Sequence, residues 1–330
     1  MPLWSPSANP QNQVDRATDG AVRILSAADT AGLHAVLNTD PVAHVSFSAA
    51  IHQRGTAAPG KSRNAALILG IDDAGIGFGT GSGTGSGARG IGTRKSGTST
   101  GATNTGTGGL TSACWVGSNI IPAAAGSAEG ALFGRALRAL RRRVSSIYGR
   151  SDPVLALLEA TGWSNYREVR DGQPLMFTTE RSAEVAPLPG VRTSRMEEFR
   201  AVERACAAMF TEELGFSPYE QGAALYRERI RHLIQAGHSL ISVDPDTRKI
   251  VFKAEFGAVT DEAVQVQGVW VSPSWRGQGL AAPGMAAVID HGLRLAPRVG
   301  LYVNSYNTAA LRAYERVGFK HFGSYTTVLF

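Results

Sequence analysis

Apolar residues recur through the second half of the chain at the spacings of amphipathic helices and buried strands. Met196 to Leu214 carries apolar side chains every three to four residues, which predicts a helix that ends at Gly215. Beyond it the pattern predicts strands over 239–243, 250–258 and 263–271, and helices over 221–236, 280–295 and 308–317. A strand over 299–303 and a pair of strands around 319–322 and 325–330 complete the expected series.

The first half has a weaker pattern of the same kind. Residues 1–20 are polar and contain prolines, so we expect a loose tail there. The pattern predicts helices over 25–37, 128–143 and 152–161, and strands over 65–69, 113–116, 144–148 and 175–179. Residues 187–190, Pro-Leu-Pro-Gly, indicate a linker. The chain of 330 residues is therefore expected to form two domains, over 21–186 and 191–330.

Glycine is unevenly distributed. Of the 39 glycines, 14 lie between Gly75 and Gly109, in a run of Gly, Ser and Thr that cannot bury enough apolar surface to order itself. We interpret it as a flexible insert in the first domain. The run contains a literal G-x-G-x-x-G from Gly85 and a G-x-S-x-G from Gly97, but neither joins a strand to a helix, so neither indicates a nucleotide site or a nucleophile.

Charge and cysteine content narrow the function classes. The net charge of +6 is spread along the chain without a cationic stripe, so nucleic-acid binding is not expected. The arginine-rich helix over 135–143 leaves a basic adaptor as a weaker hypothesis. The two cysteines and seven histidines have no metal-ligand spacing, and no apolar run of about 18 residues occurs. We expect a cytoplasmic protein without a metal or a membrane segment.

One strand–loop–helix joint carries the spacing of an anion-binding site. The predicted strand that ends at Val271 is followed by Ser-Pro-Ser-Trp-Arg-Gly-Gln-Gly-Leu-Ala over 272–281, where a helix opens. Gly277 and Gly279 let successive backbone N–H groups point into one concavity, and the start of the helix adds positive potential. The joint is therefore suited to hold a phosphate.

In this context the chain resembles the GNAT acetyltransferase superfamily. Arg276, Gly279 and Ala281 match its Gln/Arg-x-x-Gly-x-Gly/Ala signature. Asn307, followed by Tyr314 and by Gly-Phe at 318–319, resembles the second signature, and the likeness covers about residues 191–330. The resemblance implies an α/β (α+β) domain, with a mixed and mostly antiparallel sheet flanked by helices, and acetyl-CoA as acyl donor.

The resemblance also implies roles for individual residues. The pantetheine arm of acetyl-CoA would pair with the strand backbone of Val269, Trp270 and Val271, and Asn307 would contact the cofactor. Tyr314 would protonate the leaving thiolate, which suits a phenol that is protonated at neutral pH. The loop would hold the pyrophosphate through Arg276, Gly277, Gln278, Gly279, Leu280, Ala281 and Ala282.

The general base departs from the family pattern. Gln265 and Tyr302 stand where two branches of the family carry a glutamate. Glu255, on the neighbouring predicted strand, is the best remaining carboxylate for catalysis, although a solvent-facing role and an ordered water as base remain alternatives. Glu212 and Glu213 end the helix over 196–214, where they either attract a cationic amine or cap a solvated helix end.

The first domain looks like a degenerate copy of the second. An offset of 156 residues aligns Glu-Ala-Thr-Gly-Trp over 159–163 with Glu-Arg-Val-Gly-Phe over 315–319. At that offset Leu158 replaces Tyr314, Ser151 replaces Asn307, and the glycine-free stretch 120–125 replaces the anion-binding loop. The arrangement resembles tandem GNAT proteins, including two-domain acetyltransferases whose N-terminal domain has no assigned function. Acetyl-CoA is not expected to bind in this first copy.

The resemblance predicts an acetyl-CoA-dependent N-acetyltransferase. It would move an acetyl group to a primary amine, of a protein or a small molecule, by direct attack of the amine on the thioester. The alternative is an acyl-CoA-binding regulatory module without turnover, which the missing carboxylates at both customary base positions favour. The sequence predicts neither the amine nor the oligomeric state.

Overall fold

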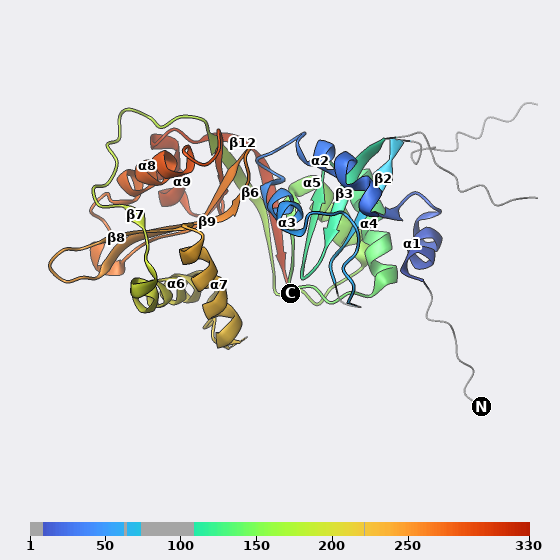
Figure 1. Ribbon diagram of the computed structural model, residues 1–330, viewed down its shortest axis with the longest axis horizontal. Coiled ribbons are helices and arrows are strands. Elements are labelled where there is room, and N and C mark those ends of the chain that lie inside the picture. Colours follow the sequence, from blue (N-terminus) through green and yellow to red (C-terminus); the bar gives the residue numbers. More distant parts are fainter. Residues whose placement is uncertain (1–8, 63–64, 74–108, 221) are drawn as a thin grey trace, which may run out of the picture.

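The computed structural model describes residues 9–62, 65–73, 109–220 and 222–330. The predicted flexible insert therefore lies outside the described residues, apart from Gly109. Within the described chain, twelve strands form one continuous sheet that runs through the whole molecule (Figure 1). Its strand order is β1-β2-β3-β4-β5-β12-β6-β11-β10-β9-β8-β7.

Two stretches of the chain contain the same series of elements. The first series is β1 (Arg23–Ile24), η1 (Ala27–Asp29), α2 (Thr30–Leu37), α3 (Val45–Arg54), β2 (Leu67–Asp72), β3 (Leu110–Val116), β4 (Asn119–Ala123), α4 (Ser127–Leu140), β5 (Ser146–Arg150), α5 (Ser151–Thr161) and β6 (Glu168–Thr178). The second is β7 (Arg192–Thr193), η3 (Met196–Glu198), α6 (Phe199–Leu214), α7 (Ala223–Gln235), β8 (Ser239–Val243), β9 (Ile250–Val259), β10 (Val264–Val271), α8 (Ala281–Gly292), β11 (Val299–Tyr302), α9 (Thr308–Arg316) and β12 (Lys320–Leu329). We call these the first and the second repeat.

The two repeats exchange their last strands. Strand β6 of the first repeat lies between β12 and β11 of the second, and β12 lies between β5 and β6 of the first. The two long strands are antiparallel to each other from Lys320, opposite Phe177, to Leu329, opposite Glu168. If each strand of the second repeat is matched to its counterpart in the first, the strand order read inward from β1 is the same as the order read inward from β7. The repeats are therefore separate along the chain but joined through the middle of one sheet.

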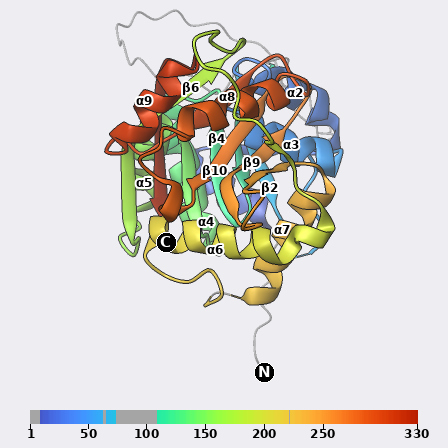
Figure 2. The same cartoon turned by 90° about the vertical axis from the view of Figure 1, so that its left-hand side faces the viewer.

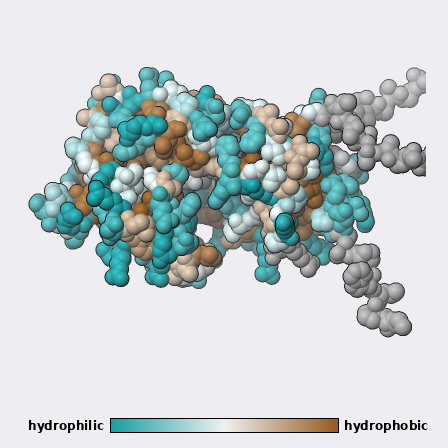
Figure 3. All heavy atoms as spheres, in the orientation of Figure 1, coloured by the Kyte–Doolittle hydropathy of each residue, from teal (hydrophilic) through white to brown (hydrophobic). Residues whose placement is uncertain are grey.

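Helices cover both faces of each repeat. In the second repeat α8 and α9 pack on the face that carries Phe252 and Phe256, and α6 and α7 pack on the opposite face against Ile241 and Ile250 (Figure 2). In the first repeat α4 and α5 cover one face of the sheet, and α2 and α3 cover the other. Figure 3 shows that the surface is hollowed between the α6–α7 side of the second repeat and the first repeat. We call this hollow the recess.

Three local expectations differ from the structure. Residues 10–18, expected as part of a loose tail, form α1 (Pro10–Thr18), because Asn9 caps the helix, Pro10 suits its first position and Val14 is buried. Helix α3 and strand β4 were not predicted from the pattern. The expected pair of strands over 319–330 is the single strand β12, which has a register shift between His321 and Gly323.

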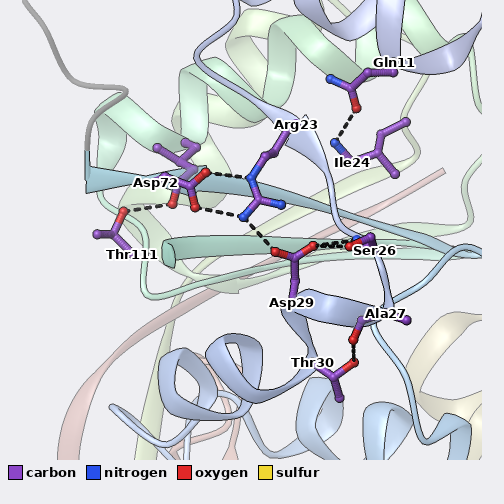
Figure 4. A network of polar contacts seen from close by, with 10 residues as sticks. Gln11, Arg23, Ile24, Ser26, Ala27, Asp29, Thr30, Asp72 and Thr111 are labelled. Carbon is purple, nitrogen blue, oxygen red and sulfur yellow. Dashed lines mark hydrogen bonds and ion pairs between the residues drawn. The ribbon is translucent and has the colours of Figure 1, made fainter. Parts of the chain in front are cut away.

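Polar contacts fix the edge strand of the first repeat (Figure 4). The guanidinium of Arg23 on β1 donates to both carboxylate oxygens of Asp72 on β2, at 2.6 and 2.9 Å, and lies 2.9 Å from Asp29. Asp29 also accepts hydrogen bonds from the backbone and side chain of Ser26. This cluster ties β1 to β2 and η1, far from the second repeat.

Candidate functional site

Strands β10 and β11 begin as parallel neighbours and then separate. Their pairing consists of Val264 opposite Val299 and Gln265 opposite Gly300. Beyond Gln265, β10 remains paired with β9 as far as Val271, but no strand in the described chain pairs with its other edge. The backbone groups along that edge face an opening between two strands of the same sheet. An extended ligand could satisfy them by pairing as a strand does.

A glycine-containing loop over 272–280 lies at the end of β10 and leads into α8. Gly277 and Gly279 have φ values of +77° and +74°, and a Cβ on either would meet no heavy atom within 4 Å. Among the described residues, no acceptor takes a hydrogen bond from the backbone amides of Gly277, Gln278 or Gly279. Together with the first turn of α8, which contains Ala281 and Ala282, these amides form an open cradle that fits a phosphate. The loop therefore has the two positive-φ glycines and the unpaired amides that the predicted anion site requires.

Arg276 points away from this cradle. Its guanidinium donates to the carbonyl of Val271 at 3.0 Å and to the carboxylate of Glu212 on α6 at 2.7 Å. The Trp270 indole nitrogen lies 3.3 Å from the same carboxylate. The Arg276 side chain thus ties the loop to the end of α6, and a direct contact with a phosphate would require Glu212 to release it.

Helix α9 carries both residues of the second signature. Asn307 is the N-cap of α9, where its side-chain oxygen accepts a hydrogen bond from the Ala310 amide at 3.2 Å. Tyr314 is 7% exposed and packs in the core beneath α8 and α9, beside Phe319. Burial raises the pKa of Tyr314, and the carboxylate of Glu213 raises it further. The phenol therefore holds its proton, as a proton donor must.

Glu255 is surrounded by donors. Its carboxylate accepts hydrogen bonds from Lys253 Nζ at 2.9 Å and from Cys206 Sγ at 3.2 Å, and Arg229 lies 3.3 Å away. Burial would raise the pKa of Glu255, but the charges of Lys253 and Arg229 outweigh it and lower the pKa to about 2. A carboxylate this acidic and only 2% exposed is poorly suited to the predicted role of general base.

Of the two positions that carry a glutamate elsewhere in the family, Gln265 is buried and Tyr302 is partly buried. The side-chain oxygen of Gln265 accepts a hydrogen bond from Ser46 of α3 at 2.7 Å. The ring of Tyr302 stacks on Tyr325 of β12 with centroids 4.9 Å apart. Gln265 thus contacts the first repeat through Ser46 of α3, and Tyr302 contacts β12 of its own repeat.

Side chains from both repeats meet beside the opening. Arg170 on β6 of the first repeat lies 3.2 Å from the carboxylate of Glu213 on α6 of the second. The sequence predicts two alternative roles for Glu212 and Glu213, attraction of a cationic amine or capping of a helix end. In the structure each is paired with an arginine, Glu212 with Arg276 and Glu213 with Arg170. Arg170 itself could not be found from sequence, because only the strand exchange places it here.

Comparisons with known proteins match the two halves of the chain to different family models. Residues 204–319 match the model of the acetyltransferase (GNAT) family, and residues 100–202 match a domain of unknown function (DUF4081). The second repeat carries a GNAT domain. A mycothiol acetyltransferase from Brachybacterium faecium is 31% identical over 188 residues, which make up 53% of this chain and 55% of that protein. The chain thus matches about half the length of this curated relative.

Solved structures resemble the whole chain rather than the GNAT domain alone. An acetyltransferase of the GNAT family from Colwellia psychrerythraea covers 94% of the chain and 99% of its own, with a TM-score of 0.52 and 14% identity. A tandem GNAT protein from the clavulanic acid biosynthesis pathway covers 93% and 97%, with a TM-score of 0.51 and 11% identity. At these identities the likeness shows the fold, and it confirms the predicted tandem architecture.

The first repeat has a shorter connection at the position of the candidate anion-binding loop. Its β4 and β5 also pair over two residues and then separate, but only residues 124–126 connect β4 to α4. The sequence alignment was therefore wrong to place 120–125 opposite the anion-binding loop, since 119–123 form a strand and the loop has been shortened. In addition, a Cβ on Gly130 or Gly134 of α4 would lie 2.4 Å from the carbonyl oxygen of Pro153 or Leu157 on α5. Helices α4 and α5 thus touch backbone to backbone.

In the described part of the chain, no three His, Cys, Asp or Glu side chains come together as a metal site. No helix there is long and apolar enough to cross a bilayer.

Proposed function

We propose that the protein is an acetyl-CoA-dependent N-acetyltransferase whose single donor site lies in the GNAT domain, between β10 and β11. The observation that carries the proposal is the unpaired edge of β10 beside the open cradle of amides and the buried Tyr314. Acetyl-CoA would supply a thioester carbonyl that an amine attacks. The backbone of Val269 to Val271 would orient the donor, and the cradle over 277–282 would hold its pyrophosphate.

Tyr314 completes the proposed chemistry. When the new C–N bond forms and the C–S bond breaks, the thiolate needs a proton, and the phenol of Tyr314 is kept protonated by its surroundings. Asn307 fixes the start of α9 and so the position of that phenol. Because Glu255 is too acidic and too buried to act as base, we propose that the amine loses its own proton to solvent in the recess.

We further propose that the acceptor is a small primary amine that enters from the recess. The side chains beside the opening come from both repeats, as Arg170 and Glu213 show, and the carboxylate of Glu213 acts on the pKa of both Tyr314 and Tyr302. The Glu213 side chain is 49% exposed although it pairs with Arg170, so its carboxylate can also accept a hydrogen bond from an ammonium group. The name of the curated relative, mycothiol acetyltransferase, supports a small-molecule acceptor rather than a protein.

The test is acetyl-CoA binding and steady-state release of CoA with a panel of small amines that includes the acceptor of the curated relative. Tyr314→Phe keeps the buried ring and removes the proton, so we expect kcat to fall about 100-fold, the lower end for loss of a general acid. Tyr166→Phe, at an exposed tyrosine outside the site, is the matched control.

The outcomes separate the two functions predicted from sequence. Turnover that depends on Tyr314 supports the enzyme. Tight binding of acetyl-CoA without turnover of any amine would favour the regulatory module, which the lack of a suitable carboxylate base among the described residues still supports. Failure of the wild-type protein to bind acetyl-CoA would overturn both.

A further inference from the structure

A charged pair is buried on the α6–α7 face of the sheet, directly beneath β10. Lys253 on β9 is fully buried, and its ammonium donates to Glu255 Oε1 and to the backbone carbonyl of Gly268, both at 2.9 Å. The sulfur of Met209 lies 3.6 Å from the same nitrogen. The proposed reaction uses neither Lys253 nor Glu255. Replacing such a pair with apolar residues is often neutral or stabilising, so stability alone does not account for it.

The carbonyl that Lys253 binds belongs to a β-bulge. On β10, Gln267 lies opposite Glu255 and Trp270 lies opposite Lys253. Two residues separate Gln267 from Trp270 on β10, whereas one residue separates their partners on β9, which makes a bulge. Gly268 within the bulge has a φ of +60°, and a Cβ there would lie 3.2 Å from Lys253 Nζ and from the Glu255 carboxyl carbon. Glycine suits both this backbone conformation and the limited space above the charged pair.

The bulge determines where the next amide points. A trans peptide unit places its C=O and N–H on opposite sides, so the Val269 N–H points away from Lys253 when the Gly268 carbonyl faces it. Val269 is the first of the three residues whose backbone is proposed to orient the donor.

We propose that Lys253 and Glu255 are positioning residues that hold the β10 bulge in the orientation the acyl donor requires. The inference rests on the proposed function, because it assigns the bulge to the donor site. Lys253 fixes the Gly268 carbonyl, and Glu255 fixes Lys253. Glu255 is itself held by Cys206 and Arg229. The role of Glu255 is thus to maintain strand geometry rather than to accept the proton of the amine.

The experiment compares two double variants of the full chain. Lys253→Met with Glu255→Gln removes both charges, so that neither is left unpaired. Arg23→Met with Asp72→Asn removes the ion pair between β1 and β2, outside the site, and is the matched control. Hydrogen exchange of the 268–271 amides, acetyl-CoA affinity and kcat are measured for both and for the wild type.

We expect the Lys253 and Glu255 variant to remain folded, to exchange the 268–271 amides at least tenfold faster and to lose about 100-fold in kcat, as a displacement of about 1 Å would cause. KM for the amine should change little, and the control should match the wild type. If the double variant does not fold, Lys253→Met alone, in which Glu255 keeps Arg229 as its counter-ion, should show the same changes.

Folded variants with wild-type exchange and wild-type kcat would overturn the inference. If the wild type binds no acetyl-CoA, the proposed function fails. The exchange measurement then still decides whether the buried pair holds the bulge, so the two failures can be distinguished.

Discussion

The contact between α4 and α5 allows a sharp test of why only one repeat is expected to bind the donor. Gly130 is in the interior of α4, where alanine normally stabilises a helix by about 1 kcal/mol. Here the added Cβ would lie 2.4 Å from the Pro153 carbonyl oxygen, which belongs to the backbone and cannot rotate away. Overpacking of this kind costs about 1–3 kcal/mol, so we expect Gly130→Ala to lower the free energy of unfolding by about 1 kcal/mol or more.

Gly32 provides the matched control. It lies in α2, and the nearest atom to an added Cβ is Leu110 Cβ at 3.7 Å, an ordinary contact distance. Gly32→Ala should therefore raise the free energy of unfolding by up to about 1 kcal/mol. Guanidinium unfolding followed by circular dichroism measures both variants, and their effects should have opposite signs. If Gly130→Ala stabilises the chain as Gly32→Ala does, α4 and α5 do not touch backbone to backbone, and this part of the argument for a single donor site fails.

Three further predictions follow from the site. Isothermal titration should give one acetyl-CoA per chain, and a stoichiometry of two would show that the first repeat also binds it. Asn307→Ala should lower the free energy of unfolding by about 1 kcal/mol through loss of the α9 cap, measured by denaturant titration, whereas an unchanged midpoint would contradict the capping role. The pKa of Glu255 lies at about 2 against an ordinary 4.5, so its ionised form stabilises the fold above pH 4.5, and this contribution is lost as the pH falls towards 2. Glu255→Gln should flatten that part of the stability–pH curve, and an unaltered curve would contradict it.

Much of the second repeat could be predicted from sequence because its local signals agree with one another. The helix that ends at Gly215, the strands on either side of the 244–249 turn and the loop that begins after Val271 all lie within a few residues of their predicted positions. Gly277 and Gly279 were identified because glycines between a strand and a helix have a physical reason to be there. The family assignment follows from the same short segments.

The remaining features depend on contacts between distant parts of the chain. Periodicity could not show that β6 pairs with β11 and β12, or that this brings Arg170 to the site. Lys253 and Glu255 alternate with apolar residues in β9, which would equally suit a strand with one face in solvent. The packing of helices over that face shows that the two charges are buried, where each requires the other as its ion-pair partner.

The exchange of β6 and β12 has a consequence for how the protein is made. On one side β5 pairs with β12, which comprises residues 320–329. The sheet of the first repeat therefore cannot close while the second repeat is still being synthesised. Until then the nascent first repeat exposes an unpaired strand edge. A chaperone could bind to this edge, or a second nascent chain could pair wrongly with it. Neither repeat is therefore a transferable module, and a gene cut at the 187–190 linker would separate two halves that each lack a central strand.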